Sequence, residues 1–355
     1  KNLPNDVKEG DRILMADGVL ELRVCRVDPP RVVCEVIRGG MLGSHKGINL
    51  PGVNIAEPSL TDKDRIDLDF AIEHHVDFVA LSFVRSPEDI KELKEIILAS
   101  GKRIGVVAKI ERPEALNKFQ GILAYTDVVM VARGDLGVEM NFEDIPSIQK
   151  NLIHACNEIG VPVITATQML ESMVSHQRPT RAEAADVANA IYDGSDAVML
   201  SGETAAGDYP IEACTVMHRI ASKTDDELIK MPTNARWVRL RETSSCQMPE
   251  TKHHNVFADA IGQAVCRMVE NLNISRIVCF TTTGYTAAAI ARYRPSVPIT
   301  AITNSDKTCR RCTMIWGVNA IAIEDFGNVE RVFGFVDQLL LDNNIVKKGE
   351  IIIIV

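Results

Sequence analysis

The chain has 355 residues, 46% of them hydrophobic and 25% charged, a globular composition at a length that predicts two or three domains. Its formal net charge of −9 argues against a nucleic-acid partner or an anionic membrane, since both select positive charge. No apolar run approaches the roughly 20 residues that cross a bilayer, and the odd number of cysteines, nine, indicates reduced thiols in a cytoplasmic protein.

Residues 1–58 have the pattern of a small β-domain. Residues 19–24 and 31–36 alternate with period two, and turn residues occur at Asp17-Gly18 and Asp28-Pro29-Pro30. Residues 1–11 are polar and charged, unlike a signal peptide. Because the chain begins without Met and ends on an apolar run at 351–355, we expect both ends of the protein to lie outside this sequence.

Residues 59–229 alternate apolar runs with helix patterns. Thr61 predicts a helix N-cap, Ser86-Pro87-Glu88-Asp89 predicts a second helix start, and Gly101 and Gly160 predict helix ends. The apolar runs are spaced by about one βα unit, which predicts a parallel sheet buried on both faces. They lie at 78–81, 104–107, 128–131, 161–164 and 197–200.

Two architectures fit this pattern: an open doubly wound sheet and a (β/α)₈ TIM barrel. Residues with reactive or ligand-type side chains end several of the runs: Lys109, Glu111, Asp135, Thr167 and Ser201. Contributions from many strand ends favour the barrel, because an open sheet concentrates its ligand contacts at one switch point. Five runs are too few for a closed barrel, so we expect its other strands to precede residue 1.

Residues 230–254 form a polar connection, and a second α/β pattern follows. Strands are predicted at 276–282, 299–303, 320–323 and 351–355, with helices such as 255–273 and 328–344 between them. The predicted fold is therefore α/β: a partial (β/α)₈ barrel at 59–229, an inserted β lid domain at 1–58 and a C-terminal α/β regulatory or oligomerisation domain at 230–355.

The segment Ala108-Lys109-Ile110-Glu111 carries the first candidate site. Residues i and i+2 of a strand share a face, so Lys109 and Glu111 are predicted to point the same way at a strand end. An ammonium beside a carboxylate suits a metal-bound anion. The alternative is an ion pair inside a barrel.

Three further segments add polar groups at strand ends. Gly134 and Gly137 allow a tight turn that could form an anion nest, and Asp135 could join Glu111 as a hard oxygen ligand for Mg²⁺, or else cap the next helix. Thr167 supplies a hydroxyl that could hold a carboxylate or relay a proton, although a strand threonine is usually structural. Ser201 supplies another hydroxyl.

Six segments, in this order and spacing, resemble those of pyruvate kinases. They are GSHKGINLPG at 43–52, AKIERPEAL at 108–116, MVARGDLGVE at 130–139, ITATQMLESM at 164–173, RPTRAEAADVANA at 178–190 and DAVMLSGETA at 196–205. The resemblance implies the last step of glycolysis, transfer of the phosphoryl group of phosphoenolpyruvate to ADP. Alternatives are another Mg²⁺-dependent pyruvate or enolate barrel enzyme, such as an aldolase, or a catalytically silent regulatory homologue.

The resemblance also implies residue roles. Lys109 matches the electrophilic lysine, and Glu111 and Asp135 match the ligands of Mg²⁺ or Mn²⁺. The Gly134 and Asp135 amides would hold the substrate carboxylate, Thr167 would contact the substrate near the carbon that is protonated, and Lys46 would reach the nucleotide phosphates. On chemical grounds, Thr167 and Ser201 could order the water that carries this proton. A K⁺ site, with ligands outside this sequence, and a homotetramer are implied as well. Where the family often has lysine after SGETA, this chain has Ala206, which puts nucleotide binding at that position in doubt.

The hydroxyl-rich turn Thr281-Thr282-Thr283-Gly284-Tyr285-Thr286 lies between a predicted strand and a predicted helix, a position that favours phosphate. In regulated pyruvate kinases, which it resembles, the matching turn holds an effector phosphate. Thr281, Thr282, Thr283, Gly284 and Thr286 are therefore predicted to bind a phosphorylated sugar, the alternative being a helix cap. The pair Cys309 and Cys312 lacks a second cysteine pair and does not predict a zinc site.

Overall fold

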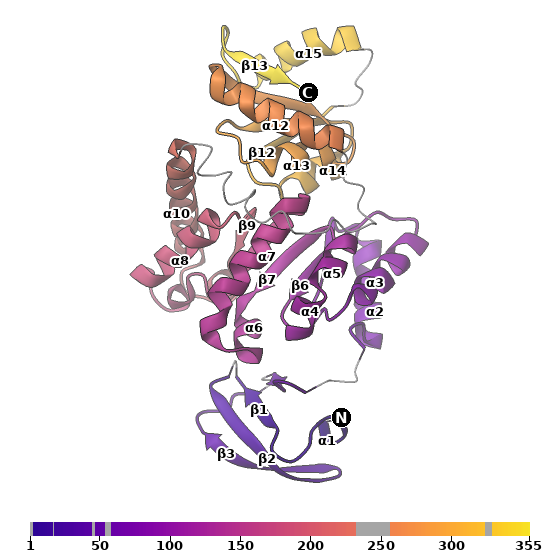
Figure 1. Ribbon diagram of the computed structural model, residues 1–355, viewed down its shortest axis with the longest axis vertical. Coiled ribbons are helices and arrows are strands. Elements are labelled where there is room, and N and C mark those ends of the chain that lie inside the picture. The colour runs from indigo at the N-terminus through magenta and orange to yellow at the C-terminus, as the bar shows by residue number, and fades with distance from the viewer. Residues whose placement is uncertain (1–2, 17, 45–46, 54–57, 232–255, 324–328) are drawn as a thin grey trace. The chain divides into compact units, whose positions relative to one another are not determined.

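The computed structural model describes residues 3–16, 18–44, 47–53, 58–231, 256–323 and 329–355 (Figure 1). The chain divides into two compact units. The first contains residues 1–152 and 165–168, and the second contains residues 153–164 and 169–355. Among the described residues, no helix is both long enough and apolar enough to cross a membrane.

The first unit begins with the predicted β-domain. After helix α1 (Leu3–Asp6), four antiparallel strands lie in the order β3-β2-β1-β4. They are β1 (Arg12–Met15), β2 (Leu20–Asp28), β3 (Arg31–Arg38) and β4 (Ile48–Asn49). The inward residues Val7, Ile13, Val24 and Leu50 form its core, as the period-two pattern predicts.

A parallel sheet follows in the same unit. Strands β5 (Phe78–Leu81), β6 (Gly105–Ile110) and β7 (Val128–Ala132) pair in chain order, and β8 (Val163–Ala166) comes next. The intervening helices are α2 (Asp62–Glu73), α3 (Pro87–Ala99), α4 (Pro113–Asn117), α5 (Phe119–Tyr125), α6 (Arg133–Glu139) and α7 (Ile145–Ile159), with the 3₁₀ turn η1 (Phe142–Asp144) before α7. All five residues of β7 are buried, which confirms a strand covered on both faces.

The predicted helix starts and stops are confirmed. Thr61 and Asp64 form a capping box, in which the Asp64 carboxylate accepts from the Thr61 amide at 2.9 Å. The Asp89 carboxylate accepts from the Ser86 amide at 2.8 Å and orders the start of α3. Gly101 and Gly160 have φ of +70° and +72°, a conformation that ends a helix and that glycine adopts without strain.

The expected tight turn at Gly134 and Gly137 is wrong. Both residues lie within α6, which begins at Arg133 directly after β7, and neither has a positive φ. A Cβ atom at Gly134 would lie 3.4 Å from the Thr167 hydroxyl oxygen, an ordinary van der Waals distance. Gly134 therefore lies against Thr167, but neither its φ nor the space around it requires glycine.

The second unit contains the first residues of β8 and then the 3₁₀ turn η2 (Glu171–Val174), α8 (Arg181–Tyr192), β9 (Ala197–Met199), α9 (Gly202–Ala205) and α10 (Pro210–Lys230). The Asp196 carboxylate accepts from the Val163 amide at 2.9 Å, which ties the start of β9 to the start of β8. Buried Met173, Val187, Ala190 and Met217 pack the helices together.

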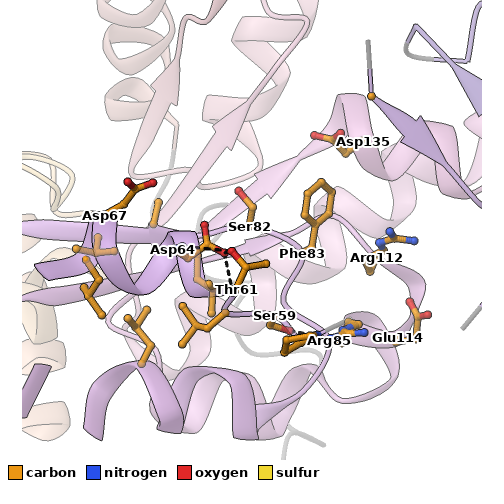
Figure 2. Close-up of a pocket in the computed structure, with 18 of the residues that line it drawn as sticks. Ser59, Thr61, Asp64, Asp67, Ser82, Phe83, Arg85, Arg112, Glu114 and Asp135 are labelled. Atoms are coloured by element: carbon orange, nitrogen blue, oxygen red, sulfur yellow. Dashed lines mark hydrogen bonds between the residues drawn. The ribbon is translucent and has the colours of Figure 1, made fainter. Parts of the chain in front are cut away.

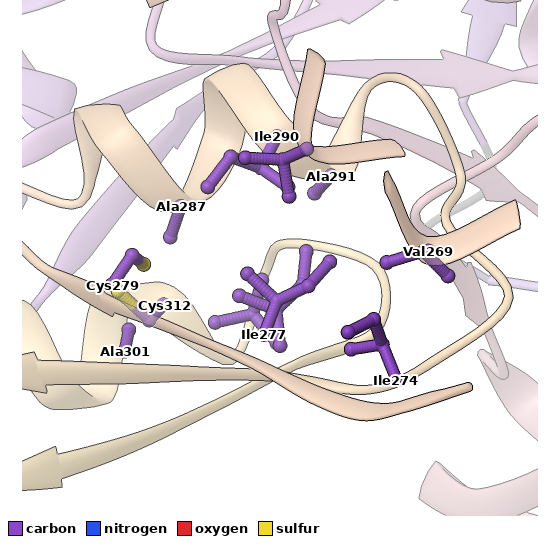
Figure 3. Close-up of a cluster of buried hydrophobic side chains, with 12 residues drawn as sticks. Val269, Ile274, Ile277, Cys279, Ala287, Ile290, Ala291, Ala301 and Cys312 are labelled. Atoms are coloured by element: carbon purple, nitrogen blue, oxygen red, sulfur yellow. The ribbon is translucent and has the colours of Figure 1, made fainter. Parts of the chain in front are cut away.

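The second unit ends in a four-stranded parallel sheet of order β12-β11-β10-β13. Its strands are β10 (Ile274–Phe280), β11 (Ile299–Thr303), β12 (Val318–Ala322) and β13 (Ile351–Ile354), and its helices are α12 (Val256–Asn271), α13 (Tyr285–Ala291), α14 (Asp306–Cys312) and α15 (Val329–Asp342). Figure 3 shows α13 packing its apolar face, Ala287 and Ile290, over Ile277.

Two of these strands begin earlier than their sequence patterns indicate. β10 starts at Ile274 because this residue pairs with Ile351, and it ends at Phe280 rather than at Thr282. β12 starts at Val318, which pairs with Ile299. Tertiary pairing therefore sets the starts of both strands, and Thr281 and Thr282 become loop residues.

Candidate active site

Lys109 and Glu111 meet at the carboxyl end of β6, as their spacing predicts. The Lys109 ammonium nitrogen lies 2.5 Å from Glu111 Oε1 and donates a hydrogen bond to Ser82 Oγ at 2.8 Å. Glu111 is 1% exposed, whereas the Lys109 side chain keeps 25% of its surface accessible. The ammonium is thus held by two partners while it still faces solvent.

The Glu111 carboxylate has the properties of a metal ligand. Its Oε2 accepts a hydrogen bond from the Phe83 amide at 2.7 Å, and its buried Oε1 lies 2.5 Å from the Lys109 ammonium nitrogen. A carboxylate is buried only where positive charge or hydrogen bonds compensate it. A divalent cation, which prefers hard oxygen ligands, could share this compensation with Lys109.

Asp135, the third residue of α6, lines a pocket of about 710 Å³ in the first unit. Figure 2 shows Asp135, Phe83 and Arg112 at one end of this pocket. Among the described residues, no three His, Cys, Asp or Glu side chains are grouped so as to hold a metal ion. A cation here would be held by two carboxylates, with water and substrate oxygens completing its shell, an arrangement typical of Mg²⁺.

Thr167 follows β8 in a strained conformation. Its φ is +68° and that of Gln168 is +55°, and non-glycine residues held there cost about 1–3 kcal/mol each. The Thr167 hydroxyl accepts from the Gly134 amide at 2.7 Å and donates to the Ala166 carbonyl at 2.6 Å. The predicted site residues Gly134 and Thr167 are therefore in direct contact, and a substrate carboxylate at this amide would replace the present bond.

Arg133 holds this strained turn in place, and the sequence reasoning missed it. Its side chain is buried and donates from Nη2 to the Thr167 carbonyl at 2.7 Å and to the Gln168 carbonyl at 3.3 Å. The available signal was an arginine directly after an apolar strand, where a charge is buried only if it is paired.

Ser82, Phe83 and Arg112 were also missed. Ser82 and Phe83 follow β5 as Glu111 follows β6, so the strand-end argument extended to β5 would have found them. Phe83 has φ of +54°, and the Arg112 guanidinium lies over its ring at 5.4 Å, within the range of a cation–π interaction.

Two further residues were predicted to take part, Ser201 in catalysis and Lys46 in nucleotide binding. Ser201 belongs to the second unit and precedes α9; its amide donates to the Glu203 carboxylate at 2.7 Å, and buried Glu203 also accepts from the Leu170 amide at 3.0 Å. Glu203 therefore shapes the Ser201 turn. Lys46 lies outside the described residues.

The predicted effector turn follows β10 in the second unit. The Thr281 hydroxyl accepts from the Gly284 amide at 2.8 Å, and the Thr283 hydroxyl accepts from the Tyr285 amide at 3.4 Å. Gly284 has φ of +89° and caps α13. In this sheet β10 lies between β11, to which the chain continues, and β13. The turn after β10 therefore lies at the switch point of the sheet. Open α/β sheets bind their ligands at such points.

The sequence matches two family models. Residues 1–214 match the pyruvate kinase barrel domain, and residues 259–355 match the pyruvate kinase alpha/beta domain. The chain belongs to the pyruvate kinase family. Its fold is accordingly that of the pyruvate kinase barrel and C-terminal α/β domains, which confirms the predicted fold class and the predicted family.

Among its pyruvate kinase relatives, the chain is 44% identical over 353 residues to pyruvate kinase 2 of Synechocystis sp., covering 99% of this chain and 57% of that protein. It is 40% identical to pyruvate kinase of Clostridium acetobutylicum, covering 100% of this chain and 72% of that protein. A crystal structure of a pyruvate kinase from Cryptosporidium parvum superposes with a TM-score of 0.88 at 36% identity, covering all of this chain and 71% of that one. The chain thus spans part of the length of its relatives.

Proposed function

We propose that the protein is a pyruvate kinase, which transfers the phosphoryl group of phosphoenolpyruvate to ADP and releases pyruvate and ATP. The observation that carries the proposal is the Lys109 ammonium, fixed between Glu111 and Ser82 yet open to solvent on a family barrel strand. Phosphoryl transfer depends on positioning and positive charge more than on covalent help, and this geometry supplies both.

Lys109 acts as the electrophile. When the phosphoryl group leaves phosphoenolpyruvate, negative charge develops on the oxygen of the pyruvate enolate. An ammonium whose position is already set stabilises that charge without reorganisation during the reaction. The contact with Ser82 restricts the rotamers of the lysine, which supports this role.

Glu111 and Asp135 hold Mg²⁺, or Mn²⁺ in its place. The buried carboxylate of Glu111 and the position of Asp135 at the pocket support this assignment. The bound ion would neutralise charge on the phosphoryl and enolate oxygens. K⁺ is proposed as a second cation on the family relationship alone.

Gly134, Asp135, Thr167 and Ser201 bind the substrate and order the water that protonates its methylene carbon. The amides of Gly134 and Asp135 lie in the first turn of α6, where N–H groups and the helix dipole attract a carboxylate. The hydroxyl of Thr167, already bonded to the Gly134 amide, lies beside that carboxylate. Lys46 binds the nucleotide phosphates. Ala206 has no charge and cannot contact these phosphates as a lysine would, so other cations bind them in its place.

The lid, barrel and C-terminal domains are assigned to 1–58, 59–229 and 230–355. We assign the turn Thr281–Thr286 to a phosphorylated-sugar effector, supported by its place at the switch point of the second sheet. A cytoplasmic homotetramer completes the proposal, on the family relationship.

A coupled assay tests the reaction directly. The purified full-length protein, with Mg²⁺ and K⁺, should form pyruvate and ATP from phosphoenolpyruvate and ADP, and lactate dehydrogenase would report the pyruvate by NADH oxidation. A protein that binds phosphoenolpyruvate in calorimetry but forms no pyruvate would be a catalytically silent homologue. Consumption of pyruvate together with an aldehyde would identify an aldolase instead.

A further inference from the structure

Glu139 and Arg112 form a buried ion pair next to the two carboxylates assigned to the metal. Arg112 Nη1 lies 2.9 Å from Glu139 Oε1, with the two side chains 10% and 2% exposed. Arg112 directly follows Glu111 in the chain, and Glu139 is the last residue of α6. The pair lies outside every role assigned above.

The pair touches both sides of the candidate site. Glu139 is four residues after Asp135 on α6, so the two side chains share a helix face with roughly 5–6 Å between their Cβ atoms. Arg112 stacks over the ring of Phe83, whose amide binds Glu111. Glu139 also accepts a hydrogen bond from Asn49, in the last strand of the β-domain, at 3.3 Å.

The charges around Glu139 show how tightly this region is coupled. Burial raises the pKa of the Glu139 carboxyl; Arg112 and Asn49 oppose the shift, while the carboxylates of Glu114 and Asp135 add to it. The charge of Asp135 therefore affects the pKa of Glu139. A guanidinium that pairs with Glu139, one helical turn from Asp135, would repel a divalent cation at the Asp135 carboxylate unless an anion compensates it.

We infer that Glu139 is a positioning residue that neutralises Arg112 and keeps the Glu111–Asp135 pair free for the metal. Arg112 is retained because its planar guanidinium stacks on Phe83 and so fixes the backbone amide that orients Glu111. Glu139 cancels its charge. This inference rests on the metal assignment proposed above.

The test is a double-mutant cycle that removes each charge of the pair. It is measured by equilibrium Mn²⁺ binding to the full-length protein, with free Mn²⁺ followed by electron paramagnetic resonance. Glu139→Gln leaves Arg112 uncompensated and should weaken Mn²⁺ binding about tenfold or more, the scale of one added charge at this range in a partly buried site. Arg112→Met removes the competing cation, while methionine can still pack on the Phe83 ring that orients the Glu111 amide contact, so Mn²⁺ binding should be unchanged or tighter. The double variant should return to within about twofold of the parent. Glu143→Gln, which removes an exposed carboxylate just beyond α6, is the matched control and should have no effect.

The inference is tested by the different directions in which the two single variants should change the affinity for Mn²⁺. If both weaken Mn²⁺ binding and the double variant is as weak or weaker, the pair is only a structural ion pair and the inference fails. If Glu139→Gln does not fold, Arg112→Met and the double variant still test it, because both must then bind Mn²⁺ at least nearly as well as the parent. Glu111→Gln separates the two proposals: if that variant binds Mn²⁺ like the parent, the metal assignment itself is wrong.

Discussion

The ends of β6 and β10 are alike in position and opposite in chemistry. Each ends a parallel strand with polar residues, Lys109 and Glu111 in the first unit and Thr281 to Thr283 in the second. After β6 the buried Glu111 carboxylate lies 2.5 Å from the Lys109 ammonium, which remains partly open to solvent. After β10 the hydroxyls of Thr281 and Thr283 already accept hydrogen bonds from their own turn.

The difference shows what each strand end requires. A buried charge persists only where an opposite charge or a ligand compensates it, since it otherwise costs stability, so the two charges after β6 depend on each other and on any ligand that they bind. A turn whose amides are bonded to its own hydroxyls does not need a ligand to be stable, so a ligand that binds there is not required for folding. We therefore expect substitutions after β6 to change the reaction strongly and those after β10 to change only its regulation.

The largest effect is expected for Lys109→Met. The ammonium acts on charge that develops in the transition state, so kcat should fall by at least about 10²-fold. Mn²⁺ binding should be largely retained, because Glu111 and Asp135 remain. Steady-state kinetics and Mn²⁺ titration measure the two effects. A kcat loss of only two- or threefold would contradict the role of Lys109.

Glu111→Gln and Asp135→Asn should each raise the Mg²⁺ concentration for half-maximal activity by roughly tenfold or more. Both changes keep the side-chain shape but remove a hard anionic ligand, and even partners one shell further out are worth about 10–100-fold in metal affinity. Activity measured across a Mg²⁺ titration tests this. Unchanged titrations in both variants would place the metal elsewhere.

Arg133→Met should lower kcat by roughly tenfold and lower the midpoint of thermal unfolding. The guanidinium pairs with the carbonyls of Thr167 and Gln168, and without it the strained turn can relax by about 1–3 kcal/mol and carry the Thr167 hydroxyl away from Gly134. Kinetics and calorimetry are the measurements. Normal kcat together with a lowered midpoint would show that Arg133 serves stability alone.

The smallest effect is expected for Thr283→Ala combined with Thr286→Ala. These hydroxyls are proposed to bind an effector phosphate, so activation by a phosphorylated sugar should be blunted, with the rate in the absence of effector as the reference. Calorimetry with sugar phosphates on the parent protein is the companion measurement. If no sugar phosphate binds or activates, the turn after β10 is only the cap of α13.

Local sequence rules predicted much of the fold because the features they read are local. Thr61 and Ser86 begin helices through side chains three residues away. Gly101 and Gly160 end helices because glycine tolerates a positive φ. The same rules failed at Gly134 and Gly137, which lie within helix α6 rather than in a tight turn.

The sequence by itself determined that Lys109 and Glu111 face the same way, because the period of a strand is two residues, and the order of its segments was sufficient to predict the family. Only the tertiary structure decided that Arg133 clamps Thr167 and that Arg112 pairs with Glu139, 27 residues away. It also decided where β10 ends. Each of these depends on which distant segments the sheet brings together, and an isolated charge or hydroxyl carries no local signal of the partner that will satisfy it.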